Sequence, residues 1–254
     1  MRVKILGCGA SGGVPLITGE WGVCDPLNPK NRRSRASIAV EKMNTTLIVD
    51  TSPDLREQCL TADIQNINGV VYTHDHADHV HGIDDLRPFL YHNKIPIPVY
   101  GNMKTINVLK SRFAYAFPHG KEFPPIYRPF VTDHILEGPF QLGDITITPF
   151  AQDHGYSTST GYRFEKVAYS TDVVRLDEEA FKTLEGIEIW IVDCIAMDPR
   201  PTHSHLAQTL EWIERVKPRQ AYLTHMSHHL DYDKLLTLLP KEVEPAYDGL
   251  VIEV

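Results

Sequence analysis

Six consecutive residues after a strand-like run constrain the fold of this chain more than any other feature. The run Gly69–Thr73 is rich in strand-forming residues, and it leads into His74, Asp75, His76, Ala77, Asp78 and His79. Three imidazoles and a carboxylate, with Asp75 and Ala77 as spacers, cannot all belong to a buried core. Imidazole nitrogens and carboxylate oxygens suit zinc or a similar divalent ion. The alternative is a polar loop with chance histidines, which four ligand-type side chains in six residues disfavour.

The length and composition predict one large domain, residues 1–254, with a substantial core. The chain has 254 residues, of which 42% are hydrophobic. Asp and Glu number 33 against 25 Lys and Arg, for a formal charge of −8. This balance disfavours broad electrostatic binding to nucleic acid or to an anionic membrane.

The cysteine pattern and the N-terminus favour a cytoplasmic protein. The four cysteines lie at 8, 24, 59 and 194 and form no C-x-x-C pair, so neither a disulfide framework nor a zinc ribbon is indicated. Residues 1–6 resemble a strand and lack the long apolar stretch of a signal peptide. No apolar run of 18 residues occurs, so we expect no membrane span.

Short strand-like runs dominate both halves of the chain, and helical segments separate them. We predict strands at 3–6, 37–40, 46–49, 69–72, 98–100, 145–150, 160–164, 167–170, 187–192 and 220–224. We predict helices after Ser52 or Asp54, either of which could cap, and at 103–116, 178–184, 206–216 and 234–239. Four prolines in 118–129 predict an irregular insertion. Two packed sheets with helices outside would satisfy this pattern.

Three later residues have ligand chemistry in comparable positions. His154, Asp172 and His225 each lie just past an apolar strand-like run, where loops gather functional groups. Singly, each is more typical of an ordinary loop residue. Together with the first cluster, the recurrence favours a shared metal site.

This order of ligands resembles that of the metallo-β-lactamase superfamily, over nearly the whole chain. The resemblance implies an α+β fold, a four-layer αββα sandwich, with two divalent ions, zinc or manganese, at one edge. It places one ion on His74, His76 and His154, the other on Asp78, His79 and His225, and Asp172 as the bridge between them.

A hydroxide between the ions would be the nucleophile, with Asp78 counted among the catalytic residues. Metal-bound water ionises near neutral pH, so no catalytic Ser or Cys is required. Asp75 could support the ligands, cap a helix or face solvent.

Two segments near the N-terminus could contact a phosphate. The glycine-rich turn 7–15 includes Ser11, and such turns let backbone N–H groups approach an anion. A basic stretch follows with Lys30, Arg32, Arg33 and Arg35. A tight connection at a sheet edge and a solvated charge run are the alternatives. We take Ser11, Arg32, Arg33 and Arg35 as candidate phosphate contacts.

Within the superfamily, these segments are similar to the branch that contains a phosphodiesterase of phosphonate metabolism and the tRNA 3′-processing endonucleases. The likeness extends through Trp21-Gly22, 202–206 and 223–228. It assigns His203 the role of general acid at the leaving oxygen, a role that suits imidazole; a helix-entry residue is the alternative. The phosphodiesterase of phosphonate metabolism in this branch also has a structural zinc, bound by closely spaced cysteines and a late histidine. Here Cys24 stands alone beside a matching His228, so we expect that zinc to be absent.

The sequence therefore predicts a metal-dependent phosphodiesterase for a small cyclic or nucleotide-like phosphate ester. A thioester, lactone or lactam hydrolase is the second hypothesis, because the same centre could attack a carbonyl. A tRNA-processing nuclease ranks lower because of the net acidity. A binding protein without activity is disfavoured by the complete ligand set. A homodimer is the default expectation for the assembly.

Overall fold

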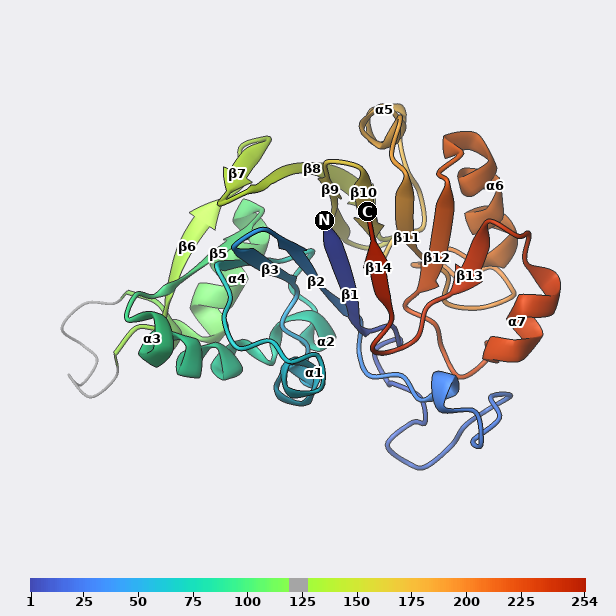
Figure 1. Cartoon of the computed structure of the whole chain (residues 1–254), viewed down its shortest axis with the longest axis horizontal. Helices are drawn as coiled ribbons and strands as arrows, with labels where there is room; N and C mark the ends of the chain where they lie inside the picture. Colours follow the sequence, from blue (N-terminus) through green and yellow to red (C-terminus); the bar gives the residue numbers. More distant parts are fainter. Residues whose placement is uncertain (119–127) are drawn as a thin grey trace.

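Two seven-stranded sheets lie face to face in the computed structural model (Figure 1). The structure describes residues 1–118 and 128–254. Most of the predicted irregular insertion at 118–129 lies outside the described residues. The two ends of the chain meet in the first sheet, where the first and last strands pair.

The first sheet has the order β14-β1-β2-β3-β4-β5-β6. Its strands are β1 (Arg2–Gly7), β2 (Ser37–Lys42), β3 (Thr45–Val49), β4 (Gly69–Val71), β5 (Ile97–Gly101), β6 (Val131–Ile135) and β14 (Val251–Glu253). The helices on its outer side are α1 (Leu55–Thr61), α2 (Ala77–Val80), α3 (Arg87–Asn93) and α4 (Met103–Arg112). Short 3-10 turns lie at Pro29–Asn31, Ile83–Leu86 and Ala114–Ala116.

The second sheet has the order β13-β12-β11-β10-β9-β8-β7. Its strands are β7 (Phe140–Leu142), β8 (Ile145–Asp153), β9 (Thr158–Phe164), β10 (Val167–Ser170), β11 (Ile189–Asp193), β12 (Gln220–Thr224) and β13 (Val243–Pro245). The helices packed with this half are α5 (Glu178–Leu184), α6 (Leu206–Val216) and α7 (Tyr232–Leu238).

The central strands are apolar on both faces because both faces are covered. In β3, Leu47 and Val49 enter the core between the sheets, whereas Ile48 packs on the helix side. Side chains alternate between faces along a strand, so one continuous apolar run serves two cores. The expected four-layer αββα sandwich of class α+β is confirmed.

Strand direction brings several strand ends to one edge of the sandwich. In the first sheet β3 runs parallel to β4, and in the second β10, β11 and β12 run parallel. β9 is antiparallel to both β8 and β10, so β8 runs in the same direction as β10. Carboxyl ends of parallel strands share one edge, so residues that follow β4, β8, β10 and β12 become neighbours.

Predicted helices differ from the structure at their ends. The helix predicted at 234–239 is Tyr232–Leu238 in the structure, because the Asp231 side chain caps it by accepting from the Lys234 N–H. The predicted helix 103–116 stops at Arg112, and a separate 3-10 turn follows Phe113, whose φ of −124° leaves the helical region.

Asp54 directly precedes α1 but makes no capping bond, because its carboxylate instead accepts from the backbone N–H and guanidinium of Arg35. The Ser52 hydroxyl accepts from the Asp54 N–H at 3.1 Å in the turn before the helix.

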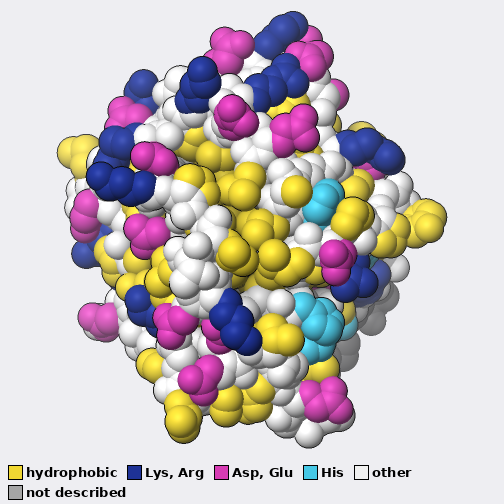
Figure 2. Space-filling view, turned by 90° about the vertical axis from the view of Figure 1, so that its right-hand side faces the viewer, with side chains coloured by type: hydrophobic (Ala, Val, Ile, Leu, Met, Phe, Trp, Pro, Cys, Tyr) yellow, Lys and Arg dark blue, Asp and Glu magenta, His cyan; other side chains and the backbone are white. Residues whose placement is uncertain are grey.

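On the face that bears α6 and α7, Lys and Arg side chains are interspersed with Asp and Glu around a central group of hydrophobic side chains (Figure 2). This face therefore has no continuous field of one sign. Within residues 1–118 and 128–254, every helix is too short or too polar to cross a bilayer. All four cysteine thiols are free and buried.

Arg33 anchors the long connection between β1 and β2, and its predicted contact with substrate phosphate is wrong. Its side chain is 2% exposed. Its guanidinium donates to the Ser227 carbonyl at 3.2 Å and to Asn31 Oδ1 at 3.3 Å. Asn31 in turn donates to Asp231 Oδ2 at 2.7 Å. These hydrogen bonds to neutral acceptors join the connection to the segment after β12 inside the fold.

Arg33→Met should lower the free energy of unfolding by about 2–4 kcal/mol, because it leaves buried acceptors without donors. Arg32→Met, which removes the same charge from an exposed neighbour, should change it by less than about 0.5 kcal/mol. Urea unfolding of both variants measures the difference. Equal effects would contradict the anchoring role of Arg33.

Candidate metal centre

The seven predicted ligands converge at the carboxyl edge of the two sheets. His74 comes shortly after β4, and the next three ligands lie at the start of α2; His154 directly follows β8, Asp172 follows β10, and His225 directly follows β12. Five of the seven are buried, and His76 is exposed. Residues up to 151 positions apart in the sequence (from 74 to 225) thus share one site.

The ligand atoms form two adjacent groups. Atoms of His74, His76, His154 and Asp172 lie within 4.8 Å of one another, as do those of Asp78, His79 and His225. A third such group, Asp172 with His203 and His225, overlaps both. This division is the one that the sequence resemblance implied.

Asp172 lies between the two groups, and each of its carboxylate oxygens faces a different one. Oδ1 is 3.8 Å from His74 Nε2 and 3.5 Å from His154 Nε2. Oδ2 is 3.1 Å from His79 Nε2 and 3.4 Å from His225 Nε2. A carboxylate in this position can bind a cation through either oxygen.

Unpartnered buried nitrogens show that these residues fit a metal ion. The Nε2 atoms of His74, His79 and His225 are buried and have no hydrogen-bond partner among the described residues. Leaving a buried polar atom unpaired costs about 1–3 kcal/mol. Nitrogen lone pairs directed at a common point beside a carboxylate are the donor set that divalent transition metals take.

Burial also favours the metal-binding form of two histidines. It lowers the pKa of His74 well below its ordinary value and lowers the pKa of His154. Neutral imidazole is the form that binds metal. For Asp172, burial opposes ionisation, but the imidazoles of His225, His79 and His74 outweigh it and hold the pKa of the carboxyl well below its usual range.

Asp50, which the sequence analysis missed, orients ligands of both groups. Its Oδ2 accepts from His79 Nδ1 at 2.7 Å and from the Thr73 hydroxyl at 2.7 Å. Because that hydroxyl donates to Asp50, its oxygen is free to accept from His74 Nδ1 at 3.0 Å. His154 is fixed separately, since its Nδ1 donates to the Thr202 carbonyl at 2.7 Å. Such partners set the ring orientation of metal-binding histidines.

Asp75 does not take the supporting role that was one hypothesis for it. Its carboxylate lies 3.8 Å from Arg112 Nη2 and 4.0 Å from Lys104 Nζ, and it forms no hydrogen bond to a ligand imidazole among the described residues. The signal for Asp50 was its place directly after β3, which parallels the place of Asp172 after β10.

Three residues of the site adopt a left-handed backbone. The φ angles are 63° at Asp50, 55° at Asp172 and 57° at His225. Residues other than glycine rarely take this conformation, and it costs about 1–3 kcal/mol when they do. Each lies where a strand ends, so the turn directs the side chain across the sheet edge.

His203 faces the same cavity from the loop before α6. Its Nδ1 lies 3.0 Å from Asp193 Oδ2, and its Nε2 lies 3.8 Å from Asp172 Oδ1. Burial disfavours its charged form, but the Asp193 carboxylate outweighs that and raises the pKa of His203 to about 9. The cavity has a volume of about 360 Å³, and Ser11, Tyr156 and Thr202 contribute to its wall. We call this space the metal cavity.

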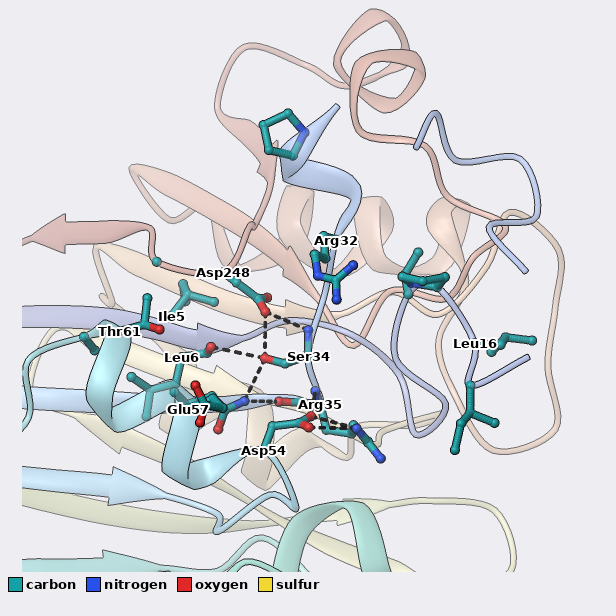
Figure 3. A pocket seen from close by; sticks show the side chains of 17 residues that line it. Ile5, Leu6, Leu16, Arg32, Ser34, Arg35, Asp54, Glu57, Thr61 and Asp248 are labelled. Atoms are coloured by element: carbon teal, nitrogen blue, oxygen red, sulfur yellow. Dashed lines mark hydrogen bonds and ion pairs between the residues drawn. The ribbon is translucent and has the colours of Figure 1, made fainter. Parts of the chain in front are cut away.

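Of the remaining candidate phosphate contacts, Ser11 lines the metal cavity, whereas Arg32 and Arg35 line a different cavity of about 610 Å³ (Figure 3). There Arg35 is paired with Asp54 at 2.8 Å. The structure therefore does not bring Arg32 and Arg35 into the wall of the metal cavity.

A cluster of His and Asp at the carboxyl edge of an αββα sandwich defines a class of metal-dependent hydrolases. A family model for the beta-lactamase superfamily domain matches residues 45–226. The chain belongs to the metallo-β-lactamase superfamily.

Individual relatives refine this placement. The crystal structure of a diphosphatase from the PhnP family is 33% identical, with a TM-score of 0.89 over 100% of this chain and 97% of that one. Zn²⁺-bound PqqB from Methylobacterium extorquens shares the fold at 18% identity and a TM-score of 0.75, over 100% of both chains. An octanoyltransferase of Porphyromonas gingivalis (strain ATCC BAA-308 / W83) is 29% identical over 98% of this chain and 51% of its own length. The chain spans about half the length of the curated relatives it matches.

Asp50→Asn should weaken metal binding by about 10- to 100-fold, because the amide has a single acceptor oxygen. It cannot replace both Oδ1, which accepts from the Thr73 N–H, and Oδ2, which accepts from His79 and the Thr73 hydroxyl. Asp75→Asn is the matched control and should change affinity by less than about twofold. Competition of each variant with a chelating dye measures affinity, and thermal melting checks the fold. Equal affinities for the two variants would contradict the role of Asp50.

Proposed function

We propose that this protein is a binuclear metal-dependent phosphodiesterase that cleaves a small cyclic or nucleotide-like phosphodiester. The observation that carries the proposal is the position of Asp172, whose two oxygens are divided between two histidine groups. One carboxylate shared in this way suits two ions, zinc or manganese, bound side by side. When bound by these residues, the ions would activate water at neutral pH and offset the charge of the phosphoryl oxygens.

Residues of the chain itself orient the ligand imidazoles and supply a proton to the leaving group. Asp78 and Asp172 bring anionic oxygens to the histidine groups, and Asp50 keeps the rings of His74 and His79 in place. Ser11 at the wall of the metal cavity has an exposed hydroxyl that can donate to a phosphoryl oxygen.

His203 is placed to protonate the leaving alkoxide. Asp193 accepts from Nδ1 and thereby fixes the ring, so Nε2–H points toward Asp172 and the cavity. An imidazole with this arrangement donates its Nε2 proton as the phosphorus–oxygen bond breaks.

Two observations favour phosphorus chemistry and a small substrate. The cavity volume of about 360 Å³ lies at the small end of the range for ligand pockets. The 33% identical relative over the whole chain is described as a diphosphatase, an enzyme of phosphate bonds. The octanoyltransferase relative keeps a thioester hydrolase in consideration, although this chain matches only 51% of that protein.

Bis(p-nitrophenyl) phosphate with Mn²⁺ or Zn²⁺ tests the reaction class, and an octanoyl thioester is the comparison. We expect turnover of the diester that is lost with chelator and restored by either metal. A metal-loaded protein that cleaves the thioester and leaves the diester intact would overturn the proposal.

Two substrates whose leaving groups differ in their need for a proton test the role of His203. His203→Gln should lower kcat by about 10²- to 10⁴-fold for an alkyl phosphodiester, whose alkoxide needs a proton. For a p-nitrophenyl ester, whose leaving group departs unprotonated, the loss should stay below about tenfold. Equal losses on both substrates would assign His203 to the structure of the site instead.

A further inference from the structure

One aromatic side chain on the wall of the metal cavity has no part in the chemistry described above. Tyr156 lines this cavity and is 92% exposed. It is the most exposed tyrosine among residues 1–118 and 128–254. A ring with so little of its surface covered by the protein is open to contact with a molecule that enters the cavity.

The turn between β8 and β9, which carries Tyr156, is closed by hydrogen bonds. The N–H of His154 donates to the Ser157 carbonyl at 3.0 Å, so the turn is bridged from one side of Tyr156 to the other. The N–H of Gly155 donates to Asp153 Oδ1 at 2.7 Å. These contacts fix the backbone from which the ring projects.

The same turn packs tightly against the loop that carries His203. Gly155 has a φ of 77°, and a Cβ there would lie 2.7 Å from the Pro201 carbonyl oxygen and 2.9 Å from Thr202 Cγ2. Glycine is therefore required at this contact. The backbone of Tyr156 is thus held at a fixed place relative to His203.

Tyr156 follows the predicted metal ligand His154 by two residues. Two steps of about 3.8 Å each limit the distance between their Cα atoms to about 7.6 Å. A phosphate at the metal centre and a planar group stacked on Tyr156 would therefore be joined by a short spacer. The ribose of a nucleotide, which joins a phosphate to a base, is such a spacer.

The rest of the metal cavity offers polar groups only. Apart from Tyr156, the described residues of its wall are His, Asp, Ser and Thr. The His and Asp side chains are the predicted ligands and His203, which serve the phosphodiester. Tyr156 supplies the apolar surface on which the remainder of a substrate could be desolvated. Nucleobases suit such a surface, because every base has a face that stacks on an aromatic ring.

We propose that Tyr156 is a specificity-determining residue that stacks on the nucleobase of the substrate. The inference rests on the proposed function and narrows its substrate class from small phosphodiesters in general to nucleotides. The phosphodiester lies at the metal centre, the ribose spans the cavity, and the base lies on the exposed ring at its mouth. The face of the ring makes this contact, so the phenol hydroxyl is not required for it.

Two cyclic esters that differ only in the base test this inference, adenosine 2′,3′-cyclic phosphate and methyl riboside 2′,3′-cyclic phosphate. The Mn²⁺-loaded protein should show a kcat/KM about 5- to 150-fold higher for the adenosine ester, the range for stacking of one base on an aromatic side chain. Tyr156→Ala should bring the two values to within about twofold of each other. Tyr156→Phe keeps the ring and should preserve the preference. Tyr91→Ala, which removes a 67% exposed tyrosine from α3, is the control and should preserve it too.

Three results with these esters would overturn the inference. The first is equal kcat/KM for both esters in the wild-type protein. The second is a preference that survives Tyr156→Ala. The third is loss of the preference in Tyr156→Phe, which would assign it to the hydroxyl. Thermal melting checks that each variant is folded, as expected for changes at an exposed side chain.

Binding separates failure of this inference from failure of the proposed function. If the protein cleaves neither ester, calorimetry of the Mn²⁺-loaded protein with adenosine 5′-monophosphate and with ribose 5-phosphate still tests the role of Tyr156. Tighter binding of the nucleotide that Tyr156→Ala abolishes would support stacking. Equal affinities for the two ligands, or no binding of either, would overturn it.

Discussion

The structure depends on one electrostatic constraint: five imidazoles and two carboxylates lie within a few ångström of one another at the edge of two sheets. Asp172 is central because its oxygens lie 3.1–3.8 Å from histidine nitrogens of both groups. Without cations, buried lone pairs would face one another unpaired. The fold tolerates this arrangement because the parallel strands fix the positions of the ligands. Asp50 fixes the ring orientation of His79 directly and that of His74 through Thr73.

The strand ends explain why ligands so far apart in the sequence can act together. β3 and β4 in one sheet and β8, β10 and β12 in the other finish at the same edge. At three of these ends the residue takes a left-handed conformation, which turns the side chain across the edge. Backbone strain at Asp50, Asp172 and His225 is compatible with a rigid core beneath them, where β4, β10 and β11 are buried along their whole length.

The sequence was informative where a functional residue directly follows an apolar strand. His154, Asp172 and His225 could be predicted because a local pattern, strand then polar loop, determines where they lie. Asp50 also directly follows an apolar strand, but its role depends on its contacts with Thr73 and with His79 in α2, which that local pattern does not encode. Likewise, the sequence shows Arg33 as one charge in a basic stretch. Its burial depends on how the connection between β1 and β2 packs against the segment after β12. The end of α4 was misjudged because Phe113 breaks a helix that composition alone would continue.

The division of labour within the site follows from what each group contacts. Residues on the strand ends supply the candidate ligand atoms, and Asp193 positions His203 through Nδ1.

The most direct test of the account is anomalous diffraction from crystals grown with Mn²⁺. The account predicts two peaks in each chain, one among His74, His76 and His154 and one among Asp78, His79 and His225, with Asp172 contacting both. A single peak, or peaks away from Asp172, would contradict it.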